Sequence, residues 1–322
     1  MKRPLIALSA FLLFWVCLWA WATQPLLLTP AKEDNPSLSR PDILEHHVRV
    51  MAEQLPPRSS IPKDLLKSAD YIVQELEKNQ ITAERQIFLE RGVEYQNIVA
   101  HFPGDGSGKS KIVIGAHYDV ADQLPGADDN ASGVAGLLEL ARIYSQHPPS
   151  HPTELVAYAL EEPPFFGTES MGSFHHAKRL SESGKPVKMM VCLEMIGFFT
   201  DEANSQKYPA KFMESAYPTT GNYIAVVSNM ENAGLTRDFK KAMVKHGELP
   251  VESVNAPALV TGIDFSDHRN YWKFNIPALM VTDTAFYRNP NYHTANDTPD
   301  TLNYQKMAQV IDAVYYSIKD LE

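Results

Sequence analysis

Hydrophobic positions follow two different periods along the chain. Apolar residues recur at helical spacing in four stretches, and short, nearly continuous apolar runs stand between them. Such runs are typical of strands that are buried on both faces. The helical stretches are residues 43–51, 65–77, 135–144 and 235–246, and the strand-like runs are residues 95–102, 111–116, 155–160, 189–193, 223–227 and 278–282.

Buried strands that alternate with helices favour a largely parallel sheet with helices on both sides. We therefore predict the α/β class, as a three-layer α/β/α arrangement around a largely parallel, mixed sheet. A glycine-rich stretch, residues 104–108, separates the first two apolar runs, and we expect those two strands to form a hairpin. No repeat is visible, so residues 41–322 are expected to form one domain.

The amino-terminal segment has a different pattern. Lys2 and Arg3 precede an almost unbroken apolar run from Pro4 to Ala22, which is typical of an export signal. Residues 20–22 (Ala-Trp-Ala) have the small-x-small form of a cleavage site, yet the run approaches the roughly 20 apolar residues that span a bilayer. Residues 1–22 are therefore expected to be either a cleaved signal peptide or a membrane anchor.

The two basic residues before the apolar run place the amino terminus inside and the body outside. We expect the body to be exported to the periplasm or the extracellular space. It would touch a membrane only through the amino-terminal segment, if that segment is not cleaved. Residues 23–40 are rich in proline and are expected to be a tether.

Composition narrows the class of function. The chain has 322 residues, of which 44% are hydrophobic and 21% charged, as in ordinary globular proteins. Its net charge of −10 leaves no basic surface for phosphates, which argues against nucleic-acid binding. Cys17 lies in the leader and Cys192 in an apolar run, so we expect no intrachain disulfide after cleavage.

Side chains that bind metals follow the apolar runs directly. In open α/β sheets, ligands bind at the carboxyl ends of the strands, so these side chains are expected to gather at one edge of the sheet. The loop 126–133 (GADDNASG) opens a helix between two of the runs and adds further carboxylates. The candidates are His117, Asp119, Asp129, Glu161, Glu162, Glu194 and His293.

Imidazole and carboxylate groups without a nearby thiolate suit zinc or a similar divalent ion. One catalytic zinc needs only three protein ligands. Five candidate ligands therefore fit two ions that share one bridging carboxylate; they are His117, Asp129, Glu162, Glu194 and His293. Glu161 is then a spare carboxylate, as a general base must be, and Asp119 is placed to accept the second imidazole N–H of His117.

These motifs resemble the dizinc aminopeptidases of metallopeptidase clan MH, whose relatives include glutamate carboxypeptidases and glutaminyl cyclases. The resemblance extends from Ile43 to the end of the chain and implies a zinc peptidase catalytic domain at residues 41–322. The matching motifs, in the order of the family, are HYD at 117–119, GADDNASG at 126–133, EE at 161–162, SDH at 266–268 and YHT at 292–294.

The resemblance implies two zinc ions per chain and a role for each ligand. Asp129 would bridge the ions, with His117 and Glu194 on one zinc and Glu162 and His293 on the other. Glu161 would be the general base. Position 194 departs from the best-known members, which have Asp there.

The implied activity is removal of the first residue of peptides that have a free amino terminus, with the substrate amine near Glu194. Two alternatives remain. Glutaminyl cyclases use the same scaffold with one zinc, but tend to have Trp where this chain has Tyr292. A receptor-like module of this fold would have lost ligands, whereas none is missing here.

Two histidine pairs outside these motifs, His46-His47 and His175-His176, are expected on helix surfaces.

Overall fold

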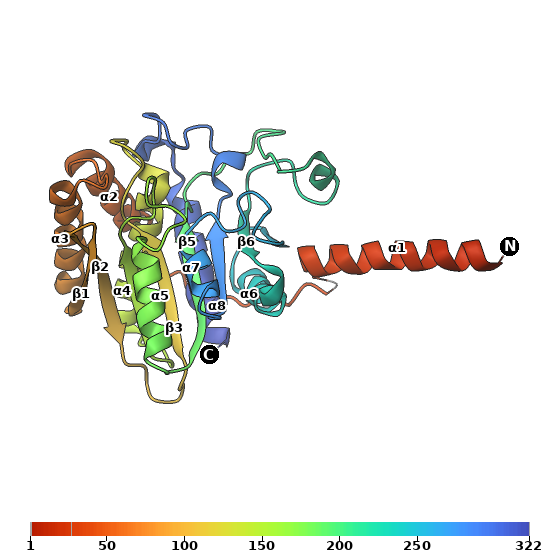
Figure 1. The fold of residues 1–322 in the computed structure, drawn as a ribbon, viewed down its shortest axis with the longest axis horizontal. Helices are drawn as coiled ribbons and strands as arrows, with labels where there is room; N and C mark the ends of the chain where they lie inside the picture. The colour runs from red at the N-terminus through yellow and green to blue at the C-terminus, as the bar shows by residue number, and fades with distance from the viewer. Residues whose placement is uncertain (1, 27, 322) are drawn as a thin grey trace.

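The computed structural model describes residues 2–26 and 28–321, with the backbone alone for residues 2–10 and 12 (Figure 1). Over these residues an eight-stranded sheet has the order β1-β2-β4-β3-β5-β8-β6-β7. Residues 1, 27 and 322 of the predicted leader, tether and domain lie outside the described part. The strands are β1 (Ala83–Glu90), β2 (Val93–Phe102), β3 (Lys111–His117), β4 (Thr153–Tyr158), β5 (Val187–Glu194), β6 (Ile224–Ser228), β7 (Val251–Asn255) and β8 (Ala278–Thr282).

The strand directions divide the sheet into a parallel centre and antiparallel flanks. β4, β3, β5 and β8 run parallel to one another. β2 is antiparallel to β1 and β4, and β6 is antiparallel to β8, while β7 runs parallel to β6. The carboxyl ends of the four central strands therefore meet at one edge.

Helices cover both faces of the sheet, because the strands are apolar on both sides. Ile112 and Ile114 of β3 belong to one core, and Val113 between them belongs to the other. The first core packs under α2 (Pro41–Arg49), α3 (Pro62–Lys78), α4 (Gly133–Gln146), α6 (Ala233–His246) and α8 (Tyr304–Leu321). The second packs under α5 (Gly172–Glu182) and α7 (His268–Trp272). The predicted three-layer α/β fold is confirmed.

The predicted hairpin is wrong. β4 lies between β2 and β3 and pairs with both, so the loop after β2 crosses over β4. The hairpin in the structure joins β2 to β1. The apolar pattern did not reveal β1, because buried or partly buried residues alternate with exposed ones along most of it. β7 was also missed, since it is a short edge strand with Glu252 and Ser253 at its centre.

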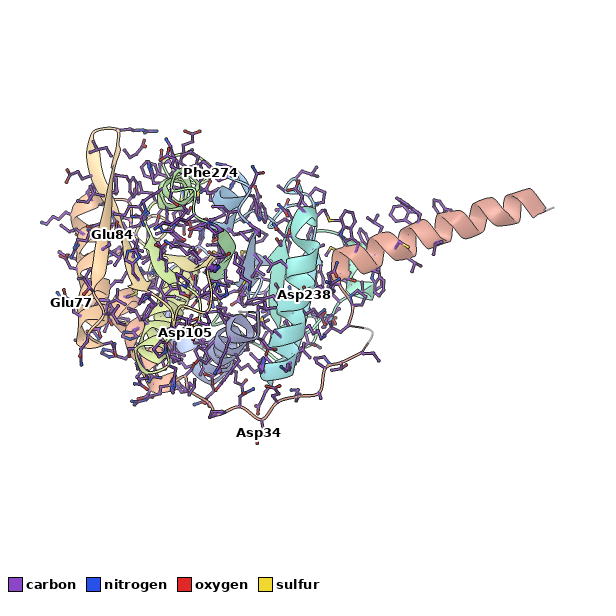
Figure 2. The ribbon with its side chains drawn as sticks, turned by 90° about the horizontal axis from the view of Figure 1, so that it is seen from below. Asp34, Glu77, Glu84, Asp105, Asp238 and Phe274 are labelled. Atoms are coloured by element: carbon purple, nitrogen blue, oxygen red, sulfur yellow. The ribbon has the colours of Figure 1, made fainter. Side chains whose placement is uncertain are left out.

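The amino-terminal helix α1 (Lys2–Thr23) projects from the body, as Figures 1 and 2 show. Within the described residues, no helix combines the length and the apolar character needed to cross a membrane. The end of α1 contacts the edge strand β7.

The segment predicted as a tether is bonded to the body over residues 32–40, and Figure 2 shows the chain around Asp34 running along the body. Lys32 donates to the carbonyl of Gly247, and the backbone N–H of Glu33 donates to the carbonyl of Lys245. Asp312 of α8 accepts hydrogen bonds from Ser37, Leu38 and Ser39, and Glu139 of α4 accepts one from the N–H of Arg40.

The two histidine pairs are not surface pairs. His46 is exposed as expected, but His47 is buried, with Nδ1 2.7 Å from the hydroxyl of Tyr71. His176 is fully buried and contacts the hydroxyl of Tyr271. Helical spacing alone could not separate the inward member of each pair from its neighbour.

A substitution at Gly104 tests how closely the crossover loop approaches the backbone of residues 150 and 151. The φ of Gly104 is +76°, and a Cβ there would lie 2.7 Å from the backbone of Ser150 and His151. Gly106 also has positive φ, but no atom lies within 4 Å of a Cβ. Gly106→Ala is expected to cost about 1 kcal/mol for the left-handed backbone alone, and Gly104→Ala at least about 1 kcal/mol more for the clash. Urea unfolding of both variants measures the difference, and equal losses would contradict the close approach.

His47 provides a test of pH dependence. Burial lowers its pKa to about 4, below the ordinary value of 6.5. Between these values the unfolded chain binds the proton more readily, so stability falls as pH decreases through this window, by about 2 kcal/mol between pH 7 and pH 4.5. His47→Gln should reduce the acid-induced loss of unfolding free energy, whereas His46→Gln on the exposed neighbour should not. An equal acid loss in the two variants would refute a buried neutral His47.

Candidate active site

The predicted ligands lie at the carboxyl edge of the parallel strands. His117 and Glu194 are the last residues of β3 and β5, and Glu161 and Glu162 follow β4 closely. Asp129 lies in the turn before α4, and His293 lies in the loop after β8. Five stretches that are far apart in sequence therefore place these side chains together.

Asp129 lies between the two histidines. Its Oδ1 is 3.3 Å from Nε2 of His117, and its Oδ2 is 3.0 Å from Nε2 of His293. Glu194 Oε2 lies 3.3 Å from Nε2 of His117, and Glu162 Oε1 lies 3.3 Å from Nε2 of His293. The structure thus forms two groups of three potential ligands that share one carboxylate.

Glu161 lies beside these groups. One of its carboxylate oxygens is within 4.8 Å of ligand atoms of His117 and Glu162. Asp119 fixes this position, because its carboxylate accepts the backbone N–H of Glu161 at 3.1 Å and that of Glu162 at 3.0 Å. The carboxylate of Asp119 lies 3.6 Å from Nδ1 of His117, and its backbone carbonyl lies nearer, at 3.2 Å. In the tautomer that leaves Nε2 free, Nδ1–H donates to that carbonyl.

The backbone adopts a costly conformation at or directly beside three of these residues. Leu160, directly before Glu161, has φ +62°, and Met195, directly after Glu194, has φ +48°. His293 itself has φ +53°. Non-glycine residues seldom adopt this region, and each instance costs about 1–3 kcal/mol. The surrounding contacts hold the chain in these turns, and the turns aim the side chains at one centre.

Three supporting residues escaped the sequence analysis. Asp297 accepts the backbone N–H of Asp129 at 3.1 Å, which orients the shared carboxylate. Arg58 is fully buried and donates to the carbonyls of Gly126 and Pro125 in the same loop. Ser266 donates to Glu194 Oε2 at 2.7 Å. Arg58 and Asp297 lie outside every motif, and nothing in the local pattern of the chain indicates them.

The SDH motif lies against this centre. Both carboxylate oxygens of Asp267 are buried without a hydrogen-bond partner among the described residues. His268 is directed away, with Nε2 2.8 Å from the carbonyl of Ile263. The ring of Tyr292 stacks on His293, with centroids 3.8 Å apart.

Residues 97–318 match the family model "Peptidase family M28". The chain belongs to peptidase family M28. It is 48% identical over 294 residues to "Uncharacterized protein YfbL" of Escherichia coli, covering 88% of this chain and 89% of that protein. It is 27% identical over 227 residues to a "Probable leucine aminopeptidase" of Trichophyton verrucosum, covering 66% of this chain and 54% of that protein. The match thus spans about half the length of this relative.

Solved structures share the fold. BSAP, a zinc aminopeptidase from Bacillus subtilis, superposes with a TM-score of 0.72 at 15% identity, covering 89% of this chain and 96% of that one. Glutaminyl cyclase of Porphyromonas gingivalis superposes with a TM-score of 0.65 at 18% identity, covering 89% of this chain and 100% of the cyclase. At these identities the likeness concerns the fold alone.

Burial raises the pKa of three carboxyl groups of this M28 site. Burial raises the pKa of Glu161 well above its ordinary value, and burial together with the charge of Asp129 raises that of Glu162 to about 7. Burial also raises the pKa of Glu194. Concentrated negative charge of this kind is stable only with protons or cations nearby.

The histidines supply part of the positive charge. Burial opposes protonation of His293, but Asp129 and Glu162 raise its pKa to about 10. Burial would raise the pKa of Asp129, yet its contacts with His117 and His293 hold it below the ordinary value.

The donor set fits a divalent cation. Among the described residues, Glu162 Oε1 is buried without a hydrogen-bond partner, and it lies 3.3 Å from Nε2 of His293 at the shared centre. Each of the two groups supplies one imidazole and two carboxylates, the hard and borderline ligands that zinc accepts. The donor set is therefore suited to a divalent cation such as zinc at this edge of the sheet.

Ser266 offers a test of how Glu194 is held. Ser266→Ala removes the donor to Glu194 Oε2 and is expected to lower zinc affinity about 10-fold to 100-fold, as measured by competition with a chromogenic chelator. Ser228 is also buried and donates to a backbone carbonyl, that of Ala278, away from the site. Ser228→Ala should leave zinc affinity unchanged. If Ser266→Ala binds zinc as tightly as the unsubstituted chain, Ser266 does not position the ligand.

Proposed function

We propose that this chain is an exported dizinc aminopeptidase, which hydrolyses the bond after the first residue of peptides with a free amino terminus. The observation that carries the proposal is the shared carboxylate: the two oxygens of Asp129 face two different histidines, and each histidine has its own glutamate. A single ion would use only one of these groups.

In this proposal His117, Asp129 and Glu194 hold one zinc, and Asp129, Glu162 and His293 hold the other. Zinc at such a site polarises a carbonyl and lowers the pKa of water. The protein contributes the alignment, since Asp119, Asp297 and Ser266 fix the carboxylates before substrate binds.

Glu161 is proposed as the general base and acid. It takes a proton from the attacking water and delivers it to the leaving amine. Burial raises the pKa of Glu161 above the ordinary value, which favours a carboxyl group that can accept a proton from water. Asp119 holds the backbone N–H of Glu161, which sets the point from which the side chain reaches the ligand groups.

Glu194 is proposed to lie beside the free α-amine of the substrate. A buried carboxylate that lines a cavity attracts an ammonium group, which limits cleavage to the first residue. Glu carries one methylene more than the Asp of the best-known relatives. The bond from Ser266 holds this longer arm in place.

Two ligand groups support hydrolysis over cyclisation. A cyclase with one zinc has no use for a complete second group, yet His117 and Glu194 are in place beside Asp129. Tyr292 also stands where cyclases tend to have Trp. A non-catalytic module would not need Glu161 aligned beside the ligands.

Export is also proposed, on the evidence of the sequence. Lys2 and Arg3 before the apolar run orient the body outward, into the periplasm or the extracellular space.

Glu161→Gln is the decisive variant. It keeps the shape of the side chain but cannot carry the proton, so we expect kcat on leucine p-nitroanilide to fall about 10²-fold to 10⁴-fold while zinc content stays at about two ions per chain. Glu182→Gln, on the exposed end of α5, is the matched control and should leave both quantities unchanged.

Peptides with an acetylated amino terminus should not be cleaved by the unsubstituted chain. Full activity in Glu161→Gln would exclude Glu161 as the base. Conversion of amino-terminal glutamine peptides to pyroglutamyl peptides with release of ammonia, without hydrolysis of leucine p-nitroanilide, would favour the cyclase.

A further inference from the structure

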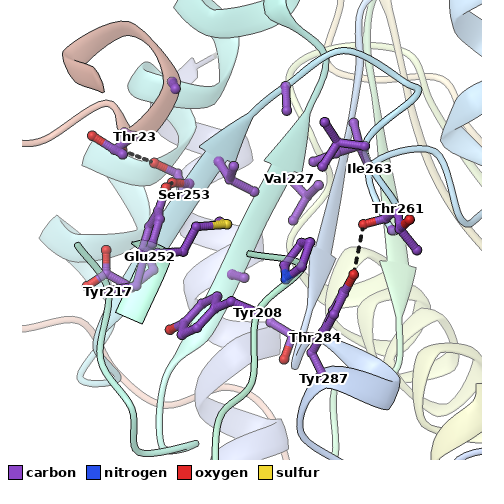
Figure 3. A pocket seen from close by; sticks show the side chains of 18 of the residues that line it. Thr23, Tyr208, Tyr217, Val227, Glu252, Ser253, Thr261, Ile263, Thr284 and Tyr287 are labelled. Carbon is purple, nitrogen blue, oxygen red and sulfur yellow. Dashed lines mark hydrogen bonds between the residues drawn. The ribbon is translucent and has the colours of Figure 1, made fainter. Parts of the chain in front are cut away.

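A cavity of about 700 Å³ extends from the metal centre to the amino-terminal helix. Its lining includes Glu194 and Tyr292 of the candidate site and Trp15, Trp19 and Thr23 of α1. Figure 3 shows Thr23 and Ser253 on one side of this space, with Thr261 and Tyr287 across it. Cavities of roughly 300–1,000 Å³ accommodate drug-sized ligands, so there is room for more than a small side chain.

One face of α1 lines the cavity. The lining residues Trp15, Leu18, Trp19 and Ala22 are spaced three and four apart, which places them on one side of a helix. Trp21 does not line the cavity, although it is 48% exposed, close to the 46% of Trp19. The two tryptophans are therefore similar in exposure but differ in what they face.

The last turn of α1 is fixed to β7. The carbonyl of Thr23 accepts a hydrogen bond from Ser253 Oγ at 2.7 Å, and that of Ala22 accepts one from Asn255 Nδ2 at 3.4 Å. The last carbonyls of a helix have no partner within the helix, so β7 supplies what they lack. Thr23 and Gln24 are buried. Residues 20–22, the expected cleavage site, thus adjoin a docked segment.

The cavity is predominantly apolar. Among the described residues that line it, only Glu194, Lys207 and Glu252 carry charge, and Glu252 lies 3.3 Å from Lys240. Aromatic and aliphatic side chains make up much of the rest, including Tyr208 and Met280. An apolar side chain gains the free energy of leaving water there, whereas a charged one would lose its hydration.

We propose that residues 15–23 remain on the mature protein and form one wall of the substrate cavity, so that the enzyme favours peptides with a bulky, apolar first residue. This inference rests on the proposed aminopeptidase function. It assigns to the leader a part in substrate selection as well as in export.

The first test concerns the leader itself. The full chain, produced with its own amino terminus and recovered from cells, is analysed by intact mass spectrometry. A mass that includes residues 15–23 supports the proposal. Cleavage after Ala22 overturns it, since the wall would then be absent.

The second test compares Trp19→Ala with Trp21→Ala. We expect Trp19→Ala to raise KM for phenylalanine p-nitroanilide about tenfold, with little change for alanine p-nitroanilide and with kcat unchanged. Trp21→Ala should leave both substrates unaffected. Identical behaviour of the two variants would overturn the proposal.

A binding measurement separates this inference from the proposed function. N-Phenyl-1-naphthylamine is a neutral, apolar fluorophore, and its affinity is measured without catalysis. Weaker binding to Trp19→Ala than to Trp21→Ala supports the wall even if no peptide is cleaved. Equal binding counts against the wall, and absence of cleavage by the unsubstituted chain counts against the aminopeptidase alone.

Discussion

A single buried carboxylate joins the two halves of the site, because the oxygens of Asp129 face histidines that belong to different strand ends. Its position is not free. Gly126 has φ +58°, and a Cβ there would lie 2.3 Å from the carbonyl of Asp129, so the turn requires glycine. Asp297 and Arg58 bond the same loop from two sides. Each of the four central parallel strands then needs to supply only one further ligand, at or after its carboxyl end.

This arrangement concentrates negative charge where water is largely excluded. Asp129, Glu161, Glu162, Glu194 and Asp267 are all buried within one region. Buried charges of one sign destabilise a fold unless counter-charges compensate. Affinity for cations is the other consequence of the same charge.

The parts of the fold and site that could be predicted share a physical reason. Strands buried on both faces produce unbroken apolar runs, so β3, β5 and β8, together with the polar residues that end them, were visible in the sequence. β7 was not visible, since an edge strand can be polar. Arg58 and Asp297 act through contacts between distant segments, and no local sequence pattern indicates such contacts.

The strap formed by residues 32–40 bears on where this protein can be shortened. Asp312 accepts hydrogen bonds from the hydroxyl of Ser37 and from the hydroxyl and backbone N–H of Ser39. Glu139 accepts one from the backbone N–H of Arg40. A recombinant chain that starts at Pro41 would lack these donors, so Asp312 on α8 and the fully buried Glu139 on α4 would lose their hydrogen bonds. The shortest chain that keeps all the hydrogen bonds of the strap therefore starts no later than Lys32, nine residues upstream of α2.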